Sequence, residues 1–194
     1  MPDIDRLLPQ PDDRFAFFQG FLNNPREVGS IIPSSRFLER RIVRSAGIDR
    51  AETIVELGPG TGGTTRALLR AMPTAAKLLS VELTPRFVNL LRREKDPRFQ
   101  VWEGSAADIK KALDDHGLPS PDVVLSGIPF STMPRELGLE ILHSVREALA
   151  PGGRFIAYQV RDRVEILGRE VFGPARKQTE ILNVPPMRVY RWIK

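Results

Sequence analysis

Apolar and polar residues alternate with two distinct periods along most of the chain from residue 51 onward. Short runs rich in β-branched and aromatic side chains predict strands, and apolar positions spaced by three or four residues predict helices. The predicted strands are Thr53–Leu57, Leu78–Leu83, Phe99–Glu103, Asp122–Ser126 and Arg154–Val160. The predicted helices between them are Gly63–Ala71, Pro85–Lys95, Ala107–Asp114 and Arg135–Ala150. This alternation is typical of a parallel sheet built from strand–helix–strand units.

The pattern changes after Val160, where a charged segment, Arg161–Glu170, precedes two more predicted strands. These strands, Lys177–Leu182 and Met187–Ile193, are joined around Pro185-Pro186, and we expect them to form a hairpin that closes one edge of the sheet. The sequence therefore predicts an α/β fold with a Rossmann-like, seven-stranded, mostly parallel sheet and helices on both faces.

Two further helices, Asp12–Leu22 and Ser34–Ala46, are predicted upstream of the sheet. We assign residues 1–50 to an N-terminal helical extension that acts as a lid or membrane contact, and residues 51–194 to the core of a single domain. At 100° per residue, the first of these helices gathers its apolar side chains on an arc of about 160°. That face consists of Phe15, Phe17, Phe18, Phe21 and Leu22, with Arg14 inside it. Such a face either contacts a membrane, with the guanidinium near a lipid phosphate, or packs on the protein's own core.

Composition narrows the possible chemistry. The 194 residues, 41% of them hydrophobic, suffice for the core of one domain. Cysteine is absent and there are two histidines, so we expect neither disulfides nor a metal site. No window approaches the ~20 consecutive apolar residues of a membrane span, and the start lacks a secretory leader pattern, so we expect a cytoplasmic protein. The net charge of +5 and the pI near 10.0 favour an anionic partner, either a nucleic acid or an anionic membrane surface.

A glycine-rich turn joins the first predicted strand of the sheet to the helix that follows it. Its sequence is Glu56-Leu57-Gly58-Pro59-Gly60-Thr61-Gly62-Gly63. Glycine permits positive φ angles and close approach of a ligand to the backbone, and a helix N-terminus offers free N–H groups to an anionic group. Glu82, at the end of the second strand, can accept hydrogen bonds from both hydroxyls of a ribose. The glycines also fit a dinucleotide pattern, but a chain of this length has no residues for a separate substrate domain.

Val55 through Gly62, together with Glu82, resembles the first two motifs of class I S-adenosylmethionine-dependent methyltransferases. The resemblance implies that S-adenosylmethionine is the cofactor, that the glycines line its methionine and ribose part, and that Glu82 binds the ribose. Ser105 stands where these enzymes often carry an Asp for the adenine amino group. Adenine is therefore expected at Ser105, at the backbone of Ala106 or at Asp108, unless Asp108 only serves the start of a helix. The cofactor-binding residues predicted in this way are Glu56, Gly58, Pro59, Gly60, Thr61, Gly62, Glu82, Leu83, Gly104, Ser105, Ala106 and Ser126.

The fourth predicted strand runs into Ser126-Gly127-Ile128-Pro129-Phe130, at the edge of the sheet where an acceptor would meet the cofactor. We predict that these five residues form the acceptor pocket, and we assign no catalytic base. The segment resembles the corresponding motif of RNA adenine dimethyltransferases, which begins with Asn or Asp. Ser126 lacks the side-chain carbonyl that would accept a hydrogen bond from an adenine amine, which weakens the RNA interpretation.

Bacterial phospholipid N-methyltransferases, which methylate phosphatidylethanolamine stepwise towards phosphatidylcholine, resemble nearly the whole chain. The motifs that carry this resemblance are Phe21-Leu22, Gly29–Ser35, Glu56–Gly62, Ser126–Pro129 and Asn183–Pro186. The resemblance implies N-methylation of a phospholipid headgroup by a protein bound peripherally at the inner face of an anionic membrane. The alternatives are another aminolipid such as ornithine lipid, a small soluble amine, RNA adenine, or a catalytically silent binding module.

Aromatic faces stabilise methylated ammonium groups, and arginine binds phosphate, so both residue types are candidates for substrate contact. The methyl transfer itself requires that a neutral amine be held in line with the sulfonium methyl group while water is excluded. The candidate substrate or membrane residues are Arg14, Phe15, Phe18, Phe21, Leu22, Ser34, Ser35, Tyr158 and Arg188.

Overall fold

The computed structural model describes residues 35–194, which contain seven strands and six α-helices. The strands are β1 (Thr53–Leu57), β2 (Lys77–Glu82), β3 (Phe99–Glu103), β4 (Val123–Ser126), β5 (Arg154–Gln159), β6 (Arg176–Glu180) and β7 (Met187–Ile193). The helices are α2 (Arg36–Ala46), α3 (Gly63–Ala71), α4 (Pro85–Leu91), α5 (Ile109–Asp115), α6 (Arg135–Ala148) and α7 (Arg163–Phe172). Three short 3-10 turns are η2 (Ile48–Arg50), η3 (Ala106–Asp108) and η4 (Phe130–Thr132).

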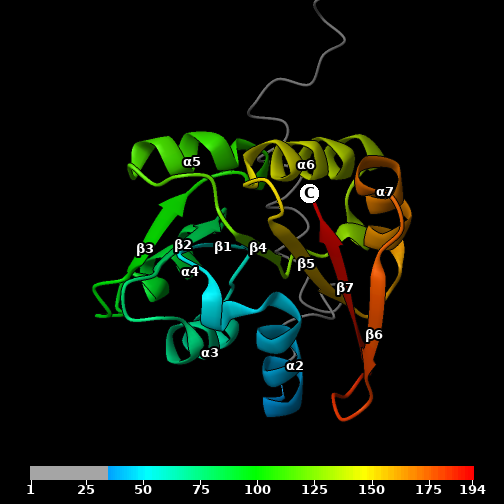
Figure 1. Cartoon of the computed structure of the whole chain (residues 1–194), viewed down its shortest axis with the longest axis horizontal. Coiled ribbons are helices and arrows are strands. Elements are labelled where there is room, and N and C mark those ends of the chain that lie inside the picture. Colours follow the sequence, from blue (N-terminus) through cyan, green and yellow to red (C-terminus); the bar gives the residue numbers. More distant parts are fainter. Residues whose placement is uncertain (1–34) are drawn as a thin grey trace, which may run out of the picture. The chain divides into compact units, whose positions relative to one another are not determined.

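All seven strands belong to one sheet with the order β3-β2-β1-β4-β5-β7-β6. The pairs from β3 to β5 are parallel, whereas β7 runs antiparallel to both β5 and β6. Figure 1 shows α5, α6 and α7 on one face of this sheet, with α2 and α3 on the opposite face. These features confirm the predicted α/β fold, including the antiparallel hairpin at one edge.

The central strands are buried because helices cover both faces of the sheet. All five residues of β1 are buried, as is typical of a parallel strand between two helical layers. On one face, α2 contributes Leu38, Ile42 and Ala46 to a hydrophobic cluster that includes Ile54 of β1 and other strand residues. The end of α2 is well defined, since Gly47 adopts φ +62° and its N–H donates to the carbonyls of Val43 and Arg44.

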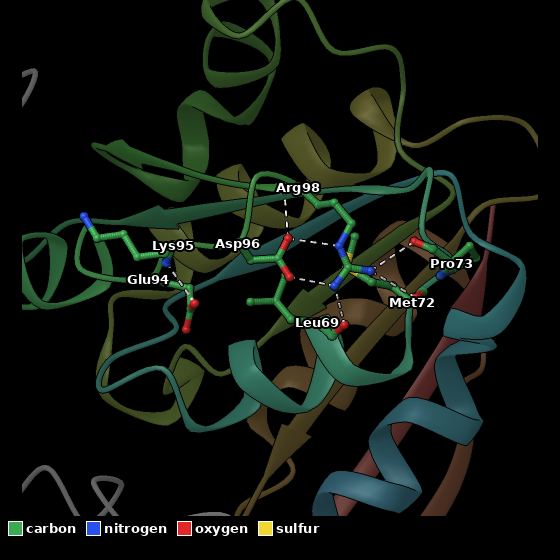
Figure 2. A network of polar contacts seen from close by, with 7 residues as sticks. All are labelled: Leu69, Met72, Pro73, Glu94, Lys95, Asp96 and Arg98. Atoms are coloured by element: carbon green, nitrogen blue, oxygen red, sulfur yellow. Dashed lines mark hydrogen bonds and ion pairs between the residues drawn. The ribbon is translucent and has the colours of Figure 1, made fainter.

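Arg98 fastens the start of β3 to the end of α3, and thereby fixes a helix whose other end adjoins the glycine turn. Its guanidinium donates to the carbonyl oxygens of Leu69, Met72 and Pro73 at 2.7, 3.3 and 3.2 Å (Figure 2). It also forms an ion pair of 2.6 Å with Asp96, and this pairing lowers the pKa of the Asp96 carboxyl to about 2. The arginine therefore satisfies carbonyl groups that the end of a helix leaves without partners.

Several predicted elements need correction, and other predictions concern residues outside the described part of the chain. The segment Arg161–Glu170, expected only to be charged, forms most of α7, which runs to Phe172. The helix α4 ends at Leu91 rather than at Lys95. The predicted first helix and the residues Arg14, Phe15, Phe18, Phe21, Leu22 and Ser34 lie outside the described residues. Within residues 35–194, no helix is both long enough and apolar enough to span a bilayer.

Candidate functional site

The glycine turn connects β1 to α3 with a backbone path that only glycine adopts readily. Gly58, Gly60 and Gly62 have φ angles of +68°, +56° and +78°. A Cβ atom at Gly58 would also lie 2.9 Å from Cγ1 of Ile128, whereas a Cβ at Gly60 or Gly63 would meet nothing within 4 Å. The turn thus packs tightly against the end of β4 on one side and leaves open space above Gly60 and the start of α3 for a ligand.

Glu82 lies at the end of β2 and holds the glycine turn in place. One carboxylate oxygen accepts a hydrogen bond from the N–H of Gly60 at 3.1 Å, and the other accepts from the N–H of Thr84 at 2.9 Å. The residue is only 6% exposed, and its burial raises the pKa of the carboxyl. Each oxygen keeps a second lone pair, so the carboxylate can still accept from a ribose hydroxyl. Glu82, the positive φ angles and the open space above Gly60 together fit the nucleoside and methionine parts of S-adenosylmethionine.

Glu56, which the motif predicts to bind the cofactor, has its carboxyl behind the glycine turn. Its carboxyl is fully buried behind the turn, where one oxygen accepts from the hydroxyls of Thr65 at 2.6 Å and Ser80 at 3.0 Å. The other oxygen has no hydrogen-bond partner among the described residues. Burial raises the pKa of this carboxyl to about 7, and the nearby negative charge of Glu82 adds to the effect. Glu56 therefore links the end of β1 to the start of α3 and to β2, and so stabilises the glycine turn.

The end of β3 lies beside Glu82, as the motif predicts. The N–H of Gly104 donates to the carbonyl oxygen of Glu82 at 3.0 Å. The hydroxyl of Ser105 accepts from the N–H of Ala107 at 3.2 Å, so it caps η3. Asp108 is exposed and stands at the N-cap position of α5, but its side chain forms no capping hydrogen bond. The candidates for adenine contact thus gather at the same edge of the sheet as the glycine turn. Leu83, Pro59 and Thr61 belong to the same edge.

The acceptor motif that follows β4 is held rigidly against the glycine turn. The N–H of Gly127 donates to the carbonyl of Leu57 at 3.0 Å, and the hydroxyl of Ser126 accepts from the N–H of Ile128 at 3.3 Å. A Cβ at Gly127 would lie 3.1 Å from the carbonyl oxygen of Gly58. Ser126 is fully buried, so its side chain shapes this turn. The structure therefore brings the cofactor and acceptor motifs into direct contact, although Gly58 and Gly127 are 69 positions apart in the sequence.

The remaining members of the acceptor motif differ in their accessibility. Phe130 is fully buried, and Ile128 is buried as well. Pro129 is partly exposed, and its carbonyl oxygen accepts from the hydroxyl of Thr132 at 2.7 Å. Gly127 and Pro129 are consequently the members of this motif that present their surface at the edge of the sheet.

Tyr158 reaches the same place from β5. Its hydroxyl donates to Oγ1 of Thr64 at 3.3 Å and would lie 2.7 Å from a Cβ at Gly127. Burial of the hydroxyl raises the pKa of Tyr158 well above its usual range, and the negative charge of Glu56 raises it further. The phenol therefore stays protonated and acts as a hydrogen-bond donor beside the acceptor motif.

Two polar residues that sequence reasoning did not single out also shape the site. The side-chain amide of Gln159 donates to the carbonyl of Ile128, and Gln159 is buried. Thr65 lies on α3 and holds Glu56, as described above. A glutamine within the apolar run of β5 was the available signal, because a buried amide needs a hydrogen-bond partner.

The other substrate candidates, Ser35 and Arg188, form their polar contacts with residues outside the acceptor motif. Ser35 caps α2, since its hydroxyl accepts from the N–H of Leu38 at 3.2 Å, and its own N–H donates to Oδ1 of Asn183 at 3.0 Å. Ser35, the last residue of one outer motif, therefore contacts the other outer motif, Asn183–Pro186. Arg188 lies 3.8 Å from Asp162, in a loose ion pair at the start of β7.

Comparison with known proteins relates this chain to methyltransferases. Residues 54–153 match the model of a methyltransferase domain family. The chain is 34% identical to the ornithine lipid N-methyltransferase of Singulisphaera acidiphila over 181 residues, covering 92% of this chain and 94% of that protein. It is 36% identical to ribosomal RNA small subunit methyltransferase A of Caulobacter vibrioides over 95 residues, covering 47% of this chain and 34% of that protein.

The fold of this chain is similar to that of a solved methyltransferase. The 1,6-didemethyltoxoflavin-N1-methyltransferase of Burkholderia thailandensis, solved with S-adenosylhomocysteine bound, superposes with a TM-score of 0.68 at 17% sequence identity. The match covers 96% of this chain and 91% of that chain.

Proposed function

We propose that this chain, which belongs to the class I S-adenosylmethionine-dependent methyltransferases, methylates the amine of an aminolipid. Similarity to the ornithine lipid N-methyltransferase over nearly the full length of both chains carries this proposal. The favoured acceptor is the primary amine of ornithine lipid. Phosphatidylethanolamine is retained as the second acceptor, because it presents the same primary ammonium beside an anionic group at a bilayer surface.

The chain's own residues position the two reactants. Glu82 accepts hydrogen bonds from the ribose, and the backbone around Gly60 and the start of α3 receives the methionine part of the cofactor. When bound, S-adenosylmethionine supplies an electrophilic methyl carbon on a sulfonium. Gly127 lies against Gly58 and is partly exposed, so an amine at the end of β4 can reach this point beside the glycine turn.

The reaction requires a neutral amine, because only an unshared electron pair on nitrogen can attack. The ammonium releases a proton to water, the nitrogen forms a bond to the methyl carbon, and the electron pair of the breaking carbon–sulfur bond stays on sulfur. Tyr158 remains protonated and therefore acts as a donor or aromatic contact. The preorganised edge of the sheet gives most of the rate by holding the reactants in line.

RNA adenine is disfavoured as the acceptor by the conformation of Ser126. Its hydroxyl is buried and engaged with the N–H of Ile128, and it offers no side-chain carbonyl to an adenine amine. The similarity to the Caulobacter ribosomal RNA methyltransferase spans about half of this chain and about a third of that protein.

The test is a methyl-transfer assay with labelled S-adenosylmethionine. Vesicles containing ornithine lipid, vesicles containing phosphatidylethanolamine, ribosomal RNA and a panel of soluble amines are incubated separately with the protein. We expect label in the lipid phase, and its loss in Glu82→Ala. Label confined to RNA or to a soluble amine would overturn the aminolipid assignment and leave the cofactor assignment intact.

A further inference from the structure

A groove of about 620 Å³ lies between α2 and the β6–β7 hairpin, apart from the cofactor and acceptor motifs. Figure 1 shows α2 beside this hairpin, and the helix contacts both of its strands. We call this the basic groove, because arginine dominates its lining. Its charged residues are Arg40, Arg41, Arg44, Arg176, Arg191 and Glu180.

The positive charge of the basic groove is poorly balanced. Glu180 is its one acidic lining residue in the described part of the chain, and it is engaged with Arg41 at 2.7 Å. Arg40, Arg44 and Arg176 are exposed, and none of them forms an ion pair within residues 35–194. Several guanidinium groups thus face one hollow without carboxylate partners, and such groups bind phosphate oxygens in bidentate fashion.

An apolar projection adjoins the basic groove. Directly after β6, the chain exposes Ile181, Leu182 and Val184 to 72%, 57% and 86%. Leu182 also lines the groove, so the apolar and basic surfaces are continuous. We call these three residues the apolar tip. Large aliphatic side chains exposed within four consecutive residues are unfavourable in water and mark a contact surface.

The apolar tip has a fixed backbone. Asn183, between the exposed residues, is only 2% exposed and points inward. Its side-chain oxygen Oδ1 accepts a hydrogen bond from the backbone N–H of Ser35 at 3.0 Å, and its side-chain Nδ2 donates to the backbone carbonyl of Pro185 at 2.9 Å. The N–H of Leu182 donates to Glu180 at 3.0 Å. The side chains of the tip are therefore held outward by polar contacts, so that little conformational freedom is lost on binding.

We propose that the basic groove and the apolar tip together form a docking surface for a bilayer that contains anionic phospholipids. The aliphatic tip enters the region between the headgroups and the acyl chains, and the arginines bind lipid phosphates around it. Proteins that bind unpaired RNA bases stack them on aromatic side chains, whereas the tip is aliphatic. Charge and apolarity adjoining one another match the surface of an anionic bilayer better than either feature alone.

The apolar tip of this docking surface lies at the same edge of the sheet as the acceptor motif. The β6–β7 pairing ends at Glu180 and Met187, and the neighbouring Arg188 lies opposite Gln159 on β5. Gln159 in turn binds the carbonyl of Ile128. The tip therefore projects from the same edge of the sheet as the acceptor motif, and docking would bring that edge to the lipid headgroups. This last consequence rests on the proposed aminolipid acceptor, whereas the docking itself does not.

The experiment measures sedimentation of the purified protein with vesicles of phosphatidylglycerol and phosphatidylcholine, and with vesicles of phosphatidylcholine alone. The tip variant carries Ile181→Ser and Val184→Ser, and the groove variant carries Arg40→Gln and Arg44→Gln. We expect the groove variant to bind anionic vesicles at least about tenfold more weakly than the parent, because it removes two positive charges. We expect a loss of similar size for the tip variant, because it removes the aliphatic side chains that would enter the lipid. The matched controls are Ile166→Ser, which is 51% exposed on α7, and Arg50→Gln, which is exposed in η2. Both should bind like the parent protein.

Unchanged vesicle binding by the tip and groove variants would overturn the docking proposal, and so would equal binding of the parent protein to anionic and neutral vesicles. Affinity for S-adenosylmethionine, measured by calorimetry, serves as the folding check and should match that of the parent protein. The proposed function fails separately: vesicle binding that depends on the tip and the groove, without methyl transfer to any lipid, would uphold docking and refute the aminolipid acceptor. Methyl transfer to lipid in detergent micelles, combined with vesicle binding that is unchanged in both variants, would uphold the aminolipid acceptor and refute docking.

Discussion

The buried carboxyl of Glu56 makes the stability of the protein depend on pH in a way that one substitution should remove. Its two neighbours, Thr65 and Ser80, donate hydrogen bonds to a single oxygen. The carbonyl oxygen of glutamine can accept the same two bonds. Glu56→Gln therefore preserves the size and these hydrogen bonds of the side chain, but it no longer ionises.

The magnitude follows from the pKa of this carboxyl, which burial raises from 4.5 to about 7. Between these two values the folded protein holds a proton that the unfolded chain has released, so the free energy of unfolding falls as the pH rises. At about 1.4 kcal/mol per pKa unit, the full effect is about 3 kcal/mol. This stability is present below pH 4.5 and is lost once the pH exceeds about 7.

The assay is urea unfolding of the parent protein and Glu56→Gln at several values between pH 5 and pH 8. We expect the variant to gain up to about 3 kcal/mol relative to the parent over this range, because the titration of all other groups is common to both proteins. Glu52→Gln, which makes the same change at an exposed carboxyl, serves as the control for the substitution itself. A constant difference for Glu56→Gln would refute the argument that burial controls this group.

Three further outcomes are expected. Glu82→Gln should weaken binding of S-adenosylmethionine about 10- to 100-fold in calorimetry through loss of charged hydrogen bonds, and an unchanged affinity would remove Glu82 from the site. Gly127→Ala should lower the free energy of unfolding by about 1–3 kcal/mol in urea, since its Cβ would lie 2.7 Å from the Tyr158 hydroxyl, and parental stability would argue against this packing. Arg98→Met should lower the free energy of unfolding by about 2 kcal/mol through loss of its contacts with Asp96 and the end of α3, and undiminished stability would show that this network contributes little.

Much of the fold could be predicted because local pattern and tertiary structure agree in the central strands. The bounds predicted for β1, β3 and β7 coincide with those observed. The helix α7 was missed because its charges dominate the segment, although Val164, Leu167, Gly168 and Val171 are buried at the spacing of a helical face. A stripe of this kind carries more information about structure than the charges around it.

In the candidate site, too, the local features could be predicted and the tertiary contacts could not. The geometry of the glycine turn was predictable because its residues are adjacent in the sequence, and Glu82 lies beside the turn as the motif predicts. Their roles in binding the cofactor stay predictions. The contact of Gly58 with Gly127 and Ile128 depends on the pairing of β1 with β4, so no local pattern could reveal it. The inward position of Glu56 likewise depends on Ser80, which a neighbouring strand contributes.

The most direct test of the aminolipid assignment is a competition within one membrane. Vesicles containing equal amounts of ornithine lipid and phosphatidylethanolamine are incubated with S-adenosylmethionine and the protein, and the extracted lipids are analysed by mass spectrometry. We expect lipids heavier by one or more methyl groups, with ornithine lipid modified first, and no such products with Glu82→Ala. Unmodified lipids, from a protein that binds S-adenosylmethionine and the vesicles normally, would contradict it.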